Sequence, residues 1–312
     1  MLRKLPLIPA ALLLIMTVLA AACGNPSTDN HSHEPNNSPK SAETKTVKDA
    51  LNRDVTVPVE PERIIAINNF GELAALGVKP IGTVDYYLKN HDPAVTQGIE
   101  SIGDQEPNME KVTALSPDLI IISDYLKPEV VESLQKIAPT FATKFGLPAF
   151  EQLHVVAELL GKTKEEQAFR VQYDERLKET KQKLQAHLKP GETALVVQFY
   201  NKAIYTFPIN AFPTIYEALG YTEPDKAKAL TAPASLSEEV LPEYAADTIF
   251  VLVADQAAEE RFKEVASGPV WKNLSAVKNN KLYVLENVRW SELSAYNMNW
   301  QLTDIVTKLG SK

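Results

Sequence analysis

Two stretches of this 312-residue chain share one layout: residues 109–123, MEKVTALSPDLIIIS, and residues 237–253, SEEVLPEYAADTIFVLV. In each, a short amphipathic segment is followed by an aspartate, Asp118 or Asp247, and then by an apolar run rich in branched residues. This order predicts a short helix followed by a buried strand, the repeating unit of an α/β fold. Its two copies predict two similarly built halves.

A glutamate stands eight residues before each aspartate, Glu110 before Asp118 and Glu239 before Asp247. Each glutamate falls near the start of its predicted helix, where unpaired N–H groups and the helix dipole favour a carboxylate. Each aspartate directly precedes a buried strand, so we interpret it as a structural hydrogen-bonding residue rather than an acid-base group. The pattern alone is compatible with two interpretations of the glutamates: charges that stabilise a helix start, or functional residues.

Strand and helix patterns alternate around both copies of the unit. In the first half the predicted elements are a strand at 63–67, a helix FGELAALG closing at Gly77, a strand PIGTV and a helix at 128–137. The second half restarts with a strand at 193–199, a helix IYEALG closing at Gly220, and the stretch VWKNLSAVKNNKLYVL, which supplies a helix, a turn and the last strand. Alternation of this kind indicates largely parallel sheets with helices on both faces.

The most helical stretch of the chain, residues 163–188, lies between the two halves. Thr163 and Glu166 match a capping box, and Pro190-Gly191 ends the run. Five apolar residues share one face: Phe169, Tyr173, Leu177, Leu184 and Leu188. A helix of about 26 residues is roughly 39 Å long, enough to run from one half to the other. An ordinary surface helix of one domain is the alternative, but it leaves the position between the repeats unexplained.

These patterns predict an α/β protein with two similar α/β lobes of mostly parallel sheets, joined by one long α-helix. We place the N-terminal lobe at 46–160, the bridging helix at 161–189 and the C-terminal lobe at 190–312. With 45% hydrophobic and 23% charged residues, the chain can bury two cores of ordinary domain size.

The N-terminus has the pattern of a bacterial lipoprotein. Residues 1–22 carry Arg3 and Lys4 ahead of a nearly uncharged run, and the small residues LAAA precede Cys23, the only cysteine. We therefore expect 1–22 to be a signal peptide and Cys23 to become the lipidated first residue. An uncleaved membrane-spanning anchor is the alternative. Either would hold the protein at the extracytoplasmic face of the cell membrane.

Residues 23–45 are polar and rich in Pro and Asn, which predicts a flexible tether between lipid and folded protein. His31 and His33 lie in this tether, and we interpret them as solvated because no other ligand type converges nearby. The remaining histidines, His91, His154 and His187, are scattered, so no protein metal site is expected.

The net charge of −8 becomes −10 when residues 1–22, with two basic and no acidic side chains, are removed. This balance argues against nucleic-acid binding, which needs clustered Lys and Arg. One cysteine allows no intramolecular disulfide and no catalytic thiol in the processed chain. The chain has no CxxC, HExxH, Gly-rich phosphate loop or GxSxG, so we expect no enzyme. A surface adhesin stays a further alternative, distinguished by lacking a pocket between the lobes.

Five sequence strings that follow Cys23 resemble, in the same order, the substrate-binding lipoproteins of bacterial ABC importers for iron(III)-siderophores, heme and cobalamin. They are VPVEPERIIAI, GELAALGVKPIG, IGDQEPNMEKVTALSPDLIIIS, LSEEVLPEYAADTIFVLV and VWKNLSAVKNNKLYVL, and they cover nearly all of the mature chain. The resemblance implies two α/β lobes bridged by one long helix, in agreement with the patterns above. It also implies a monomer with no cofactor, whose ligand brings its own iron.

The resemblance gives the two glutamates a role. It implies that Glu110 and Glu239, one on each lobe, contact arginines on the two permease subunits of an importer driven by a cytoplasmic ATPase. Two carboxylates held apart by a rigid helix suit a pair of basic sockets related by two-fold symmetry.

Topology places the ligand site. In open α/β sheets small molecules bind beyond the carboxyl ends of the strands, here in the cleft between the lobes. The candidate ligand-binding residues are those that follow the predicted strands: Asn69, Phe70, Tyr86, Tyr87, Lys89, Tyr125, Tyr200, Arg289, Trp290, Tyr296 and Trp300. Aromatic residues dominate this set, which suits a bulky metal chelate with an organic exterior. Trp290 and Tyr200 are the strongest individual candidates.

Charge narrows the ligand class. A ferric tris-catecholate carries about three negative charges, and its burial needs several cationic partners. Only Lys89 and Arg289 among the candidates are cationic. We therefore favour a ferric hydroxamate or citrate-hydroxamate chelate over a ferric catecholate, ferric citrate, heme or cobalamin. The single bridging helix predicts a small closure of the lobes on the ligand.

Overall fold

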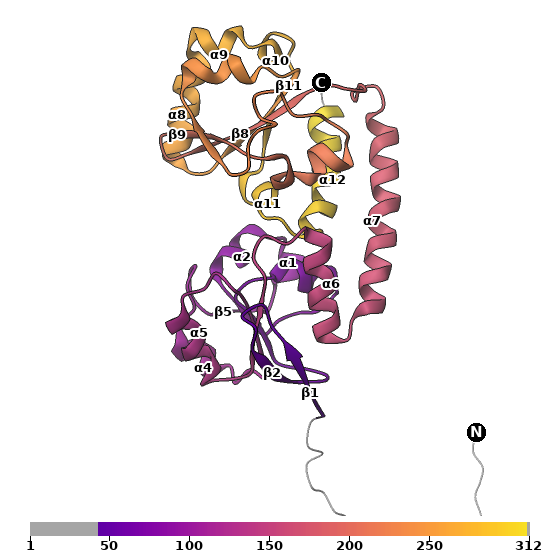
Figure 1. The fold of residues 1–312 in the computed structure, drawn as a ribbon, viewed down its shortest axis with the longest axis vertical. Helices are drawn as coiled ribbons and strands as arrows, with labels where there is room; N and C mark the ends of the chain where they lie inside the picture. Colours follow the sequence, from indigo (N-terminus) through magenta and orange to yellow (C-terminus); the bar gives the residue numbers. More distant parts are fainter. Residues whose placement is uncertain (1–42, 311–312) are drawn as a thin grey trace, which may run out of the picture. The chain divides into compact units, whose positions relative to one another are not determined.

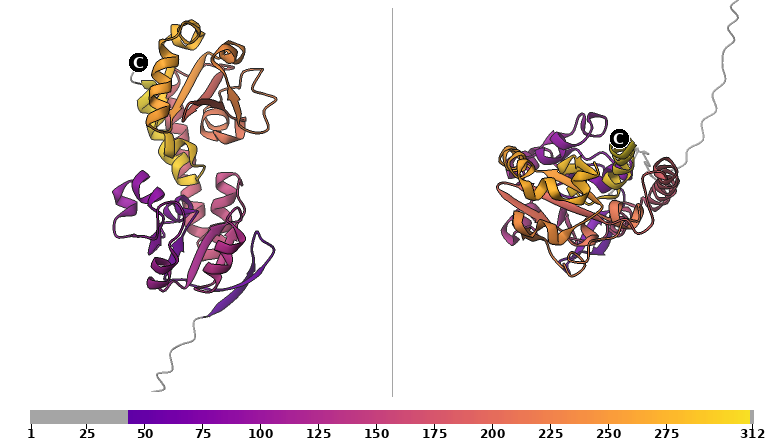
Figure 2. Two further views of the ribbon diagram at one scale, coloured as in Figure 1. Left: turned by 90° about the vertical axis from the view of Figure 1, so that its left-hand side faces the viewer. Right: turned by 90° about the horizontal axis from the view of Figure 1, so that it is seen from above.

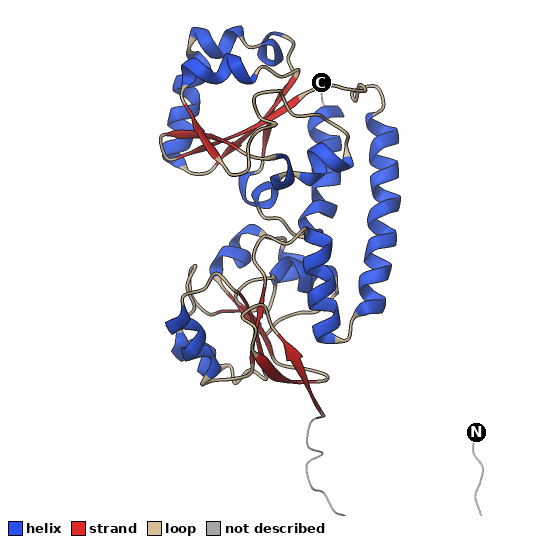
Figure 3. Ribbon diagram, viewed as in Figure 1, coloured by secondary structure: helices blue, strands red, loops and turns tan. Residues whose placement is uncertain are grey.

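The computed structural model describes residues 43–310, which belong to one compact unit. Their strands form two five-stranded sheets and one two-stranded ribbon (Figure 3). Figures 1 and 2 agree that the two sheets lie apart along the longest axis of the molecule. The signal peptide 1–22, Cys23, His31 and His33 lie outside the described residues. Among residues 43–310, no helix is long and apolar enough to cross a membrane.

The N-terminal lobe is built on the sheet β5-β4-β3-β6-β7, in which every neighbouring pair is parallel. The strand β6 lies next to the central strand β3. All five of its residues, LIIIS, are buried, and four of them are apolar, as expected for a parallel strand covered on both faces. The elements are β1 (Thr44–Lys48), β2 (Asp54–Pro58), β3 (Ile64–Ala66), α1 (Phe70–Ala75), β4 (Gly82–Thr83), α2 (Asp85–Asn90), α3 (Pro93–Thr96), β5 (Glu100–Ser101), α4 (Met109–Ala114), β6 (Leu119–Ser123), α5 (Pro128–Gln135), β7 (Thr140–Thr143) and α6 (Ala149–Leu160). The ribbon strand β1 begins at Thr44, inside the segment predicted as tether.

The C-terminal lobe is built on the mixed sheet β10-β9-β8-β11-β12. Its pairs β8–β11 and β11–β12 are parallel, whereas β8–β9 and β9–β10 are antiparallel. The elements are β8 (Ala194–Tyr200), β9 (Ala203–Thr206), η1 (Ile209–Ala211), η2 (Thr214–Ala218), β10 (Ala234–Leu236), η3 (Glu238–Tyr244), β11 (Thr248–Val253), α8 (Gln256–Ser267), α9 (Pro269–Asn273), α10 (Ser275–Lys278), β12 (Leu282–Leu285), α11 (Asn287–Ser291) and α12 (Ala295–Gly310). The predicted fold class is confirmed, with parallel pairing complete in only one of the two lobes.

The repeated aspartates perform the same structural task in both lobes. The Asp118 carboxylate accepts hydrogen bonds from the backbone N–H groups of Glu62 at 2.7 Å and Arg63 at 2.9 Å. The Asp247 carboxylate accepts from the N–H and the hydroxyl of Thr193, at 3.0 and 2.9 Å. Each aspartate thus joins the start of its own strand to the start of the parallel neighbour. The structural interpretation is confirmed, although the partners are distant in sequence rather than local.

The bridging helix α7 spans Thr163–Leu184, so it is shorter than the predicted 163–188. Its 22 residues correspond to about 33 Å. The predicted capping box is wrong, because the Glu166 carboxylate instead accepts from Arg170 Nε at 2.8 Å and interacts with His154 Nδ1 at 2.9 Å. The His154 contact joins α7 to α6, whereas the Arg170 contact lies within α7. The residue before the helix, Lys162, makes no capping hydrogen bond with its side chain.

A second long helix, α12, runs beside α7, and the sequence patterns did not predict it (Figure 1). Met298 and Leu302 of α12 form a buried cluster with Ala149 of α6 and Tyr173 of α7. Ala295, at the start of the helix, is fully buried in the core of the N-terminal lobe, whereas Ile305 is buried in the core of the C-terminal lobe. Two helices therefore connect the lobes.

Candidate functional site

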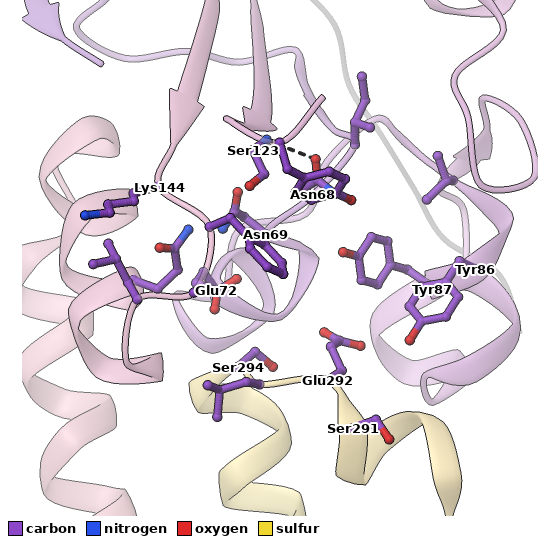
Figure 4. A pocket seen from close by; sticks show the side chains of 18 of the residues that line it. Asn68, Asn69, Glu72, Tyr86, Tyr87, Ser123, Lys144, Ser291, Glu292 and Ser294 are labelled. Atoms are coloured by element: carbon purple, nitrogen blue, oxygen red, sulfur yellow. Dashed lines mark hydrogen bonds between the residues drawn. The ribbon is translucent and has the colours of Figure 1, made fainter. Parts of the chain in front are cut away.

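A pocket of about 540 Å³ lies at the carboxyl ends of the N-terminal sheet (Figure 4). All five strands of that sheet lead into its wall, because parallel strands end at one edge. The lining from this lobe is Ile67, Asn68, Asn69, Glu72, Val84, Tyr86, Tyr87, Gln105, Ser123, Tyr125, Lys144, Phe145, Gly146, Leu147 and Gln152. The C-terminal lobe contributes Ala211 and the segment Ser291–Ser294. The pocket therefore lies between the lobes, as topology predicted.

Hydrogen bonds fix the polar side chains that follow β3 and β6. The side-chain oxygen Oδ1 of Asn68 accepts from the Ser123 N–H at 3.0 Å, and Asn68 Nδ2 donates to the Tyr125 hydroxyl at 2.9 Å. The neighbouring Asn69 begins α1 with φ of 63°, a left-handed conformation that Asn tolerates better than most residues. Its Oδ1 accepts from the Thr143 hydroxyl at 2.8 Å. These contacts present a rigid amide surface to the pocket.

Aromatic side chains form the open part of the wall. Tyr125 is 56% exposed, and its ring meets that of Phe145 edge to face at a centroid distance of 5.1 Å. Tyr86 and Tyr87 also meet edge to face, at 5.2 Å. Burial raises the pKa of both tyrosines above the ordinary range, so both stay neutral hydrogen-bonding groups. Together these rings provide the apolar contact area that an organic chelate would cover.

Two buried carboxyl groups lie on the deep side of the pocket. Glu72 comes from α1 and is 3% exposed, and Glu292 comes from the turn between α11 and α12. Burial raises the pKa of Glu72 to about 7. Burial, followed by repulsion from Glu72, raises the pKa of Glu292 to about 8. Near neutral pH the pair therefore retains protons that exposed carboxyl groups would have lost.

His91 lies beside Glu292, with Nε2 at 3.5 Å from the Glu292 Oε2. Its Nδ1 is 3.2 Å from the carbonyl oxygen of Tyr87, which only accepts, so Nδ1 carries the proton of a neutral ring. Burial, followed by repulsion from Arg289, lowers the pKa of His91 to about 4. His91 is therefore neutral at physiological pH and adds no charge to the pocket. Among residues 43–310, no three His, Cys, Asp or Glu residues are grouped to hold a metal ion.

The structure brings Asn69, Tyr86, Tyr87 and Tyr125 together at the pocket, and it places the other candidates elsewhere. Phe70 is buried in the core of the N-terminal lobe, on the far side of the backbone turn that presents Asn69. Lys89 is exposed and pairs with Asp85 at 3.2 Å and Asp104 at 3.3 Å. Neither residue lines this pocket.

The candidates from the C-terminal lobe also do not line the pocket. Trp290 is 2% exposed in the core and donates to Asp304 at 2.8 Å. Tyr200 is exposed at the end of β8, outside the pocket wall. The Arg289 guanidinium stacks on Trp300 with its central carbon 4.0 Å from the ring centroid, lies 5.9 Å from the centroid of Tyr296, and pairs with Asp92 at 3.2 Å. Arg289 and Asp92 thus form an ion pair between the two lobes, outside the pocket wall.

The two repeated glutamates lie away from the pocket. Glu110 is exposed in the first turn of α4, whose start is capped by Asn108 accepting from the Lys111 N–H at 3.1 Å. Glu239 is exposed in the 3₁₀ segment η3 rather than in an α-helix, because Pro242 interrupts that segment. A contact with the Ser237 side chain lowers the pKa of Glu239, which keeps it ionised. Each lobe thus presents one of the two repeated glutamates at its surface.

A sequence profile of the periplasmic binding protein family matches residues 66–288. The chain belongs to the periplasmic binding protein family. The resemblance drawn from the five sequence strings is thereby confirmed. The matched region begins at the last residue of β3 and ends in α11, so it includes α7 and the whole pocket wall except the segment Ser291–Ser294.

Three relatives of this periplasmic binding protein carry specific descriptions. The iron(3+)-hydroxamate-binding protein FhuD of Bacillus subtilis is 32% identical over 311 residues, 96% of this chain and 95% of FhuD. The probable siderophore-binding lipoprotein YfiY of the same organism is 28% identical over 319 residues, 94% and 95% of the two chains. The crystal structure of Staphylococcus aureus SirA complexed with staphyloferrin B superposes with a TM-score of 0.74 at 25% identity, covering 86% of this chain and 99% of SirA.

In this periplasmic binding protein, the pocket residues that sequence reasoning missed include eight polar ones and the aromatic Phe145. The polar residues are Glu72, Gln105, Ser123, Lys144, Gln152, Ser291, Glu292 and Ser294. Glu72 is the only charged residue of FGELAALG, and that isolation was a usable signal. Lys144 and Phe145 directly follow β7, a strand that the sequence patterns did not delimit. No local pattern marked the segment Ser291–Ser294.

Proposed function

We propose that this protein is the extracytoplasmic solute-binding component of an ABC importer, and that it captures a ferric siderophore in the pocket between its lobes. The observation that carries the proposal is the wall itself, with aromatic rings at its open part and fixed amides behind them. FhuD and YfiY are described as binding proteins for such iron complexes, and both match this chain over nearly its whole length. The protein binds its ligand and performs no chemistry on it.

The favoured ligand is a ferric hydroxamate or a citrate-hydroxamate chelate. Lys144 is the only cationic side chain in the pocket wall of the described residues, whereas two carboxyl groups face the same space. A ferric tris-catecholate, with about three negative charges, would meet little charge compensation there. Cations are therefore scarce in the pocket wall, as they are among the residues predicted from the sequence, where only Lys89 and Arg289 are cationic. Ferric catecholate, ferric citrate, heme and cobalamin are the alternatives.

A binding panel tests this function. Intrinsic fluorescence of the purified protein is titrated with ferric hydroxamates, a ferric catecholate, ferric citrate, heme and cobalamin. We expect saturable quenching by a ferric hydroxamate, with the chelate recovered chemically unchanged. Tight binding of ferric catecholates with none of hydroxamates would overturn the ligand class, and turnover of the chelate would overturn the binding-protein assignment.

We also propose that Glu110 and Glu239 dock the protein on the two permease subunits of the importer. Both side chains are exposed, lie on different lobes and take no part in the pocket wall. The charge reversals Glu110→Lys and Glu239→Lys should each abolish uptake of the ferric chelate while leaving its dissociation constant unchanged. Glu179→Lys, at an exposed position of α7, is the matched control and should transport normally. Normal transport by both docking variants would refute the proposal.

Anchoring through Cys23 is the remaining part of the proposed function. The apolar segment before Cys23 and the lipoprotein description of YfiY support it. Cys23→Ala should abolish palmitate labelling and release the protein from the membrane fraction. If the variant stayed in the membrane fraction, residues 1–22 would be a retained anchor instead.

A further inference from the structure

Two carboxyl groups from opposite lobes come together on the deep side of the pocket. In Figure 4, Glu72 of α1 and Glu292 of the α11–α12 turn both face the pocket space. The turn approaches α1 closely because Gly71 has no side chain. A Cβ placed on Gly71 would lie 3.3 Å from Glu292 Oε1 and 2.3 Å from the Ser294 hydroxyl oxygen. Glu292 is therefore positioned beside the residue that precedes Glu72.

The same side of the pocket holds buried acceptor atoms without hydrogen-bond donors. Among the described residues, Glu292 Oε2 and Gln152 Oε1 are buried and make no hydrogen bond. Gln152 is 8% exposed and lines the pocket, and the Glu292 side chain is 14% exposed. His91 Nε2 lies 3.5 Å from Glu292 Oε2, but it carries no proton when Nδ1 donates to the Tyr87 carbonyl. A buried acceptor without a donor is destabilising, so a donor on the ligand would be strongly favoured here.

The cations near this pair compensate its charge only in part. Lys144 lines the pocket but is exposed. Arg289 pairs with Asp92 at 3.2 Å and stacks on Trp300, and its effect on the pKa of Glu292 is smaller than those of burial and Glu72. Burial is the largest cause of the raised pKa values of Glu72 and Glu292, and Arg289 offsets only part of the rise at Glu292. A positive charge supplied by a ligand would remove the penalty.

We propose that Glu72, Glu292 and Gln152 bind a protonated amino group of the ligand, so that the captured chelate is a ferric hydroxamate with a free cationic amine. This inference rests on the proposed function. An ammonium group has three N–H donors and a compact positive charge, which match two carboxylates and one amide oxygen. The aromatic rings of Tyr86 and Tyr125 would then cover the chelate, and the acidic side of the pocket would hold its amine.

A matched pair of ligands tests the inference. One is a linear ferric trihydroxamate with a free terminal amine, and the other is the same chelate with that amine acetylated. The wild-type protein at pH 7.5 should bind the free amine about tenfold or more tightly than the acetylated form, as expected for charge-assisted hydrogen bonds. Glu72→Gln and Glu292→Gln should each remove most of this preference while leaving affinity for the acetylated chelate nearly unchanged. Glu106→Gln, an exposed change of equal charge outside the pocket wall, is the control and should keep the preference.

The outcomes separate this inference from the function on which it rests. If neither chelate binds, the hydroxamate function itself fails. If both bind with equal affinity, the function stands and the amine site is refuted. A free diamine without iron is the third arm, and binding of the diamine as tight as that of the chelate would show an amine receptor rather than a siderophore site.

Proton release gives an independent readout. Binding of a cation to partly protonated carboxyl groups should expel protons, so the calorimetric enthalpy should differ between phosphate and Tris buffers for the free amine only. The free-amine affinity should fall as the pH is lowered from about 8 to about 6, because protonation of Glu72 and Glu292 competes with the ammonium group. The other charged or titratable groups around the pair are His91, Tyr86, Tyr87, Lys144 and Arg289 with its partner Asp92. Equal proton release by the two chelates would contradict the site.

Discussion

At the scale of single residues, Trp290 and Tyr125 have different environments although both follow strands. Trp290 is enclosed in the core of the C-terminal lobe, whereas Tyr125 is more than half exposed at the pocket. Trp290→Ala should lower the free energy of unfolding by about 3–5 kcal/mol. Tyr125→Ala should leave stability nearly unchanged and weaken ligand binding by roughly tenfold. Urea denaturation and fluorescence titration of both variants measure the two effects. A loss of stability in Tyr125→Ala together with a loss of binding alone in Trp290→Ala would contradict the structure.

The buried carboxyl of Glu72 should make stability depend on pH. Its pKa rises from 4.5 in the unfolded chain to about 7 in the folded protein, so the folded state favours the protonated form. The corresponding stability is complete below about pH 4.5 and is lost as the pH rises to about 7, a change of about 3 kcal/mol. Glu72→Gln cannot ionise and should lose correspondingly less stability over this range. Urea midpoints at pH 4.5 and 7.5 provide the measurement, with the exposed Glu179→Gln as control; identical pH profiles would refute the effect.

At the scale of elements, the contact between α1 and the turn before α12 depends on Gly71. A side chain there would overlap the Ser294 side chain, so Gly71→Ala should destabilise the protein by about 1–3 kcal/mol. Ser294→Gly provides the missing space and costs only a few tenths of a kcal/mol at a helix start, where the Ser294 hydroxyl accepts from the Asn297 N–H at 3.3 Å. The double variant should therefore be more stable than Gly71→Ala alone. Thermal unfolding measures this rescue.

Gly310→Ala is the control for that experiment, because a Cβ at Gly310 meets no atom within 4 Å. It should leave the melting temperature unchanged or slightly higher. A Gly71→Ala variant as stable as the wild type would show that the two elements separate freely.

Sequence reasoning located one wall of the pocket and missed the other, for a reason visible in the two sheets. All strands of the N-terminal sheet are parallel, so the residues after β3, β4 and β6 share an edge, and Asn69, Tyr86, Tyr87 and Tyr125 meet there. In the C-terminal sheet two pairs are antiparallel, and the chain after β12 turns into α11, which buries Trp290. In the C-terminal lobe, the residues that follow the strands therefore do not identify the pocket wall.

The acidic side of the pocket was beyond the reach of local patterns for a different reason. Glu72 and Glu292 lie far apart in sequence and come together only because α12 crosses to the N-terminal lobe. The alternation of helix and strand predicted the fold class, but the predicted elements ended at the strand β12. They did not include the helix α12. Packing between distant elements, rather than periodicity, creates this part of the site.

At the scale of the whole molecule, several independent contacts limit the movement of the lobes. The helices α7 and α12 pack together, and Arg289 of the C-terminal lobe pairs with Asp92 of the N-terminal lobe. Gly71 of α1 also lies close to Ser294 in the turn before α12. We expect the radius of gyration from small-angle X-ray scattering to change little when a ferric chelate binds. A large decrease would show that the contacts break on closure. Asp92→Ala, which removes one of them, should increase the change.

The crossing helix α12 also bears on the order in which the protein folds. Nascent chains generally fold domain by domain from the N-terminus as the ribosome extends them. Here the N-terminal lobe buries Ala295, and its helix α6 packs against Met298, so its core stays unfinished until α12 has been synthesised. The first lobe to be made is therefore among the last parts to reach its final packing, and both lobes complete their folding through the same terminal helix.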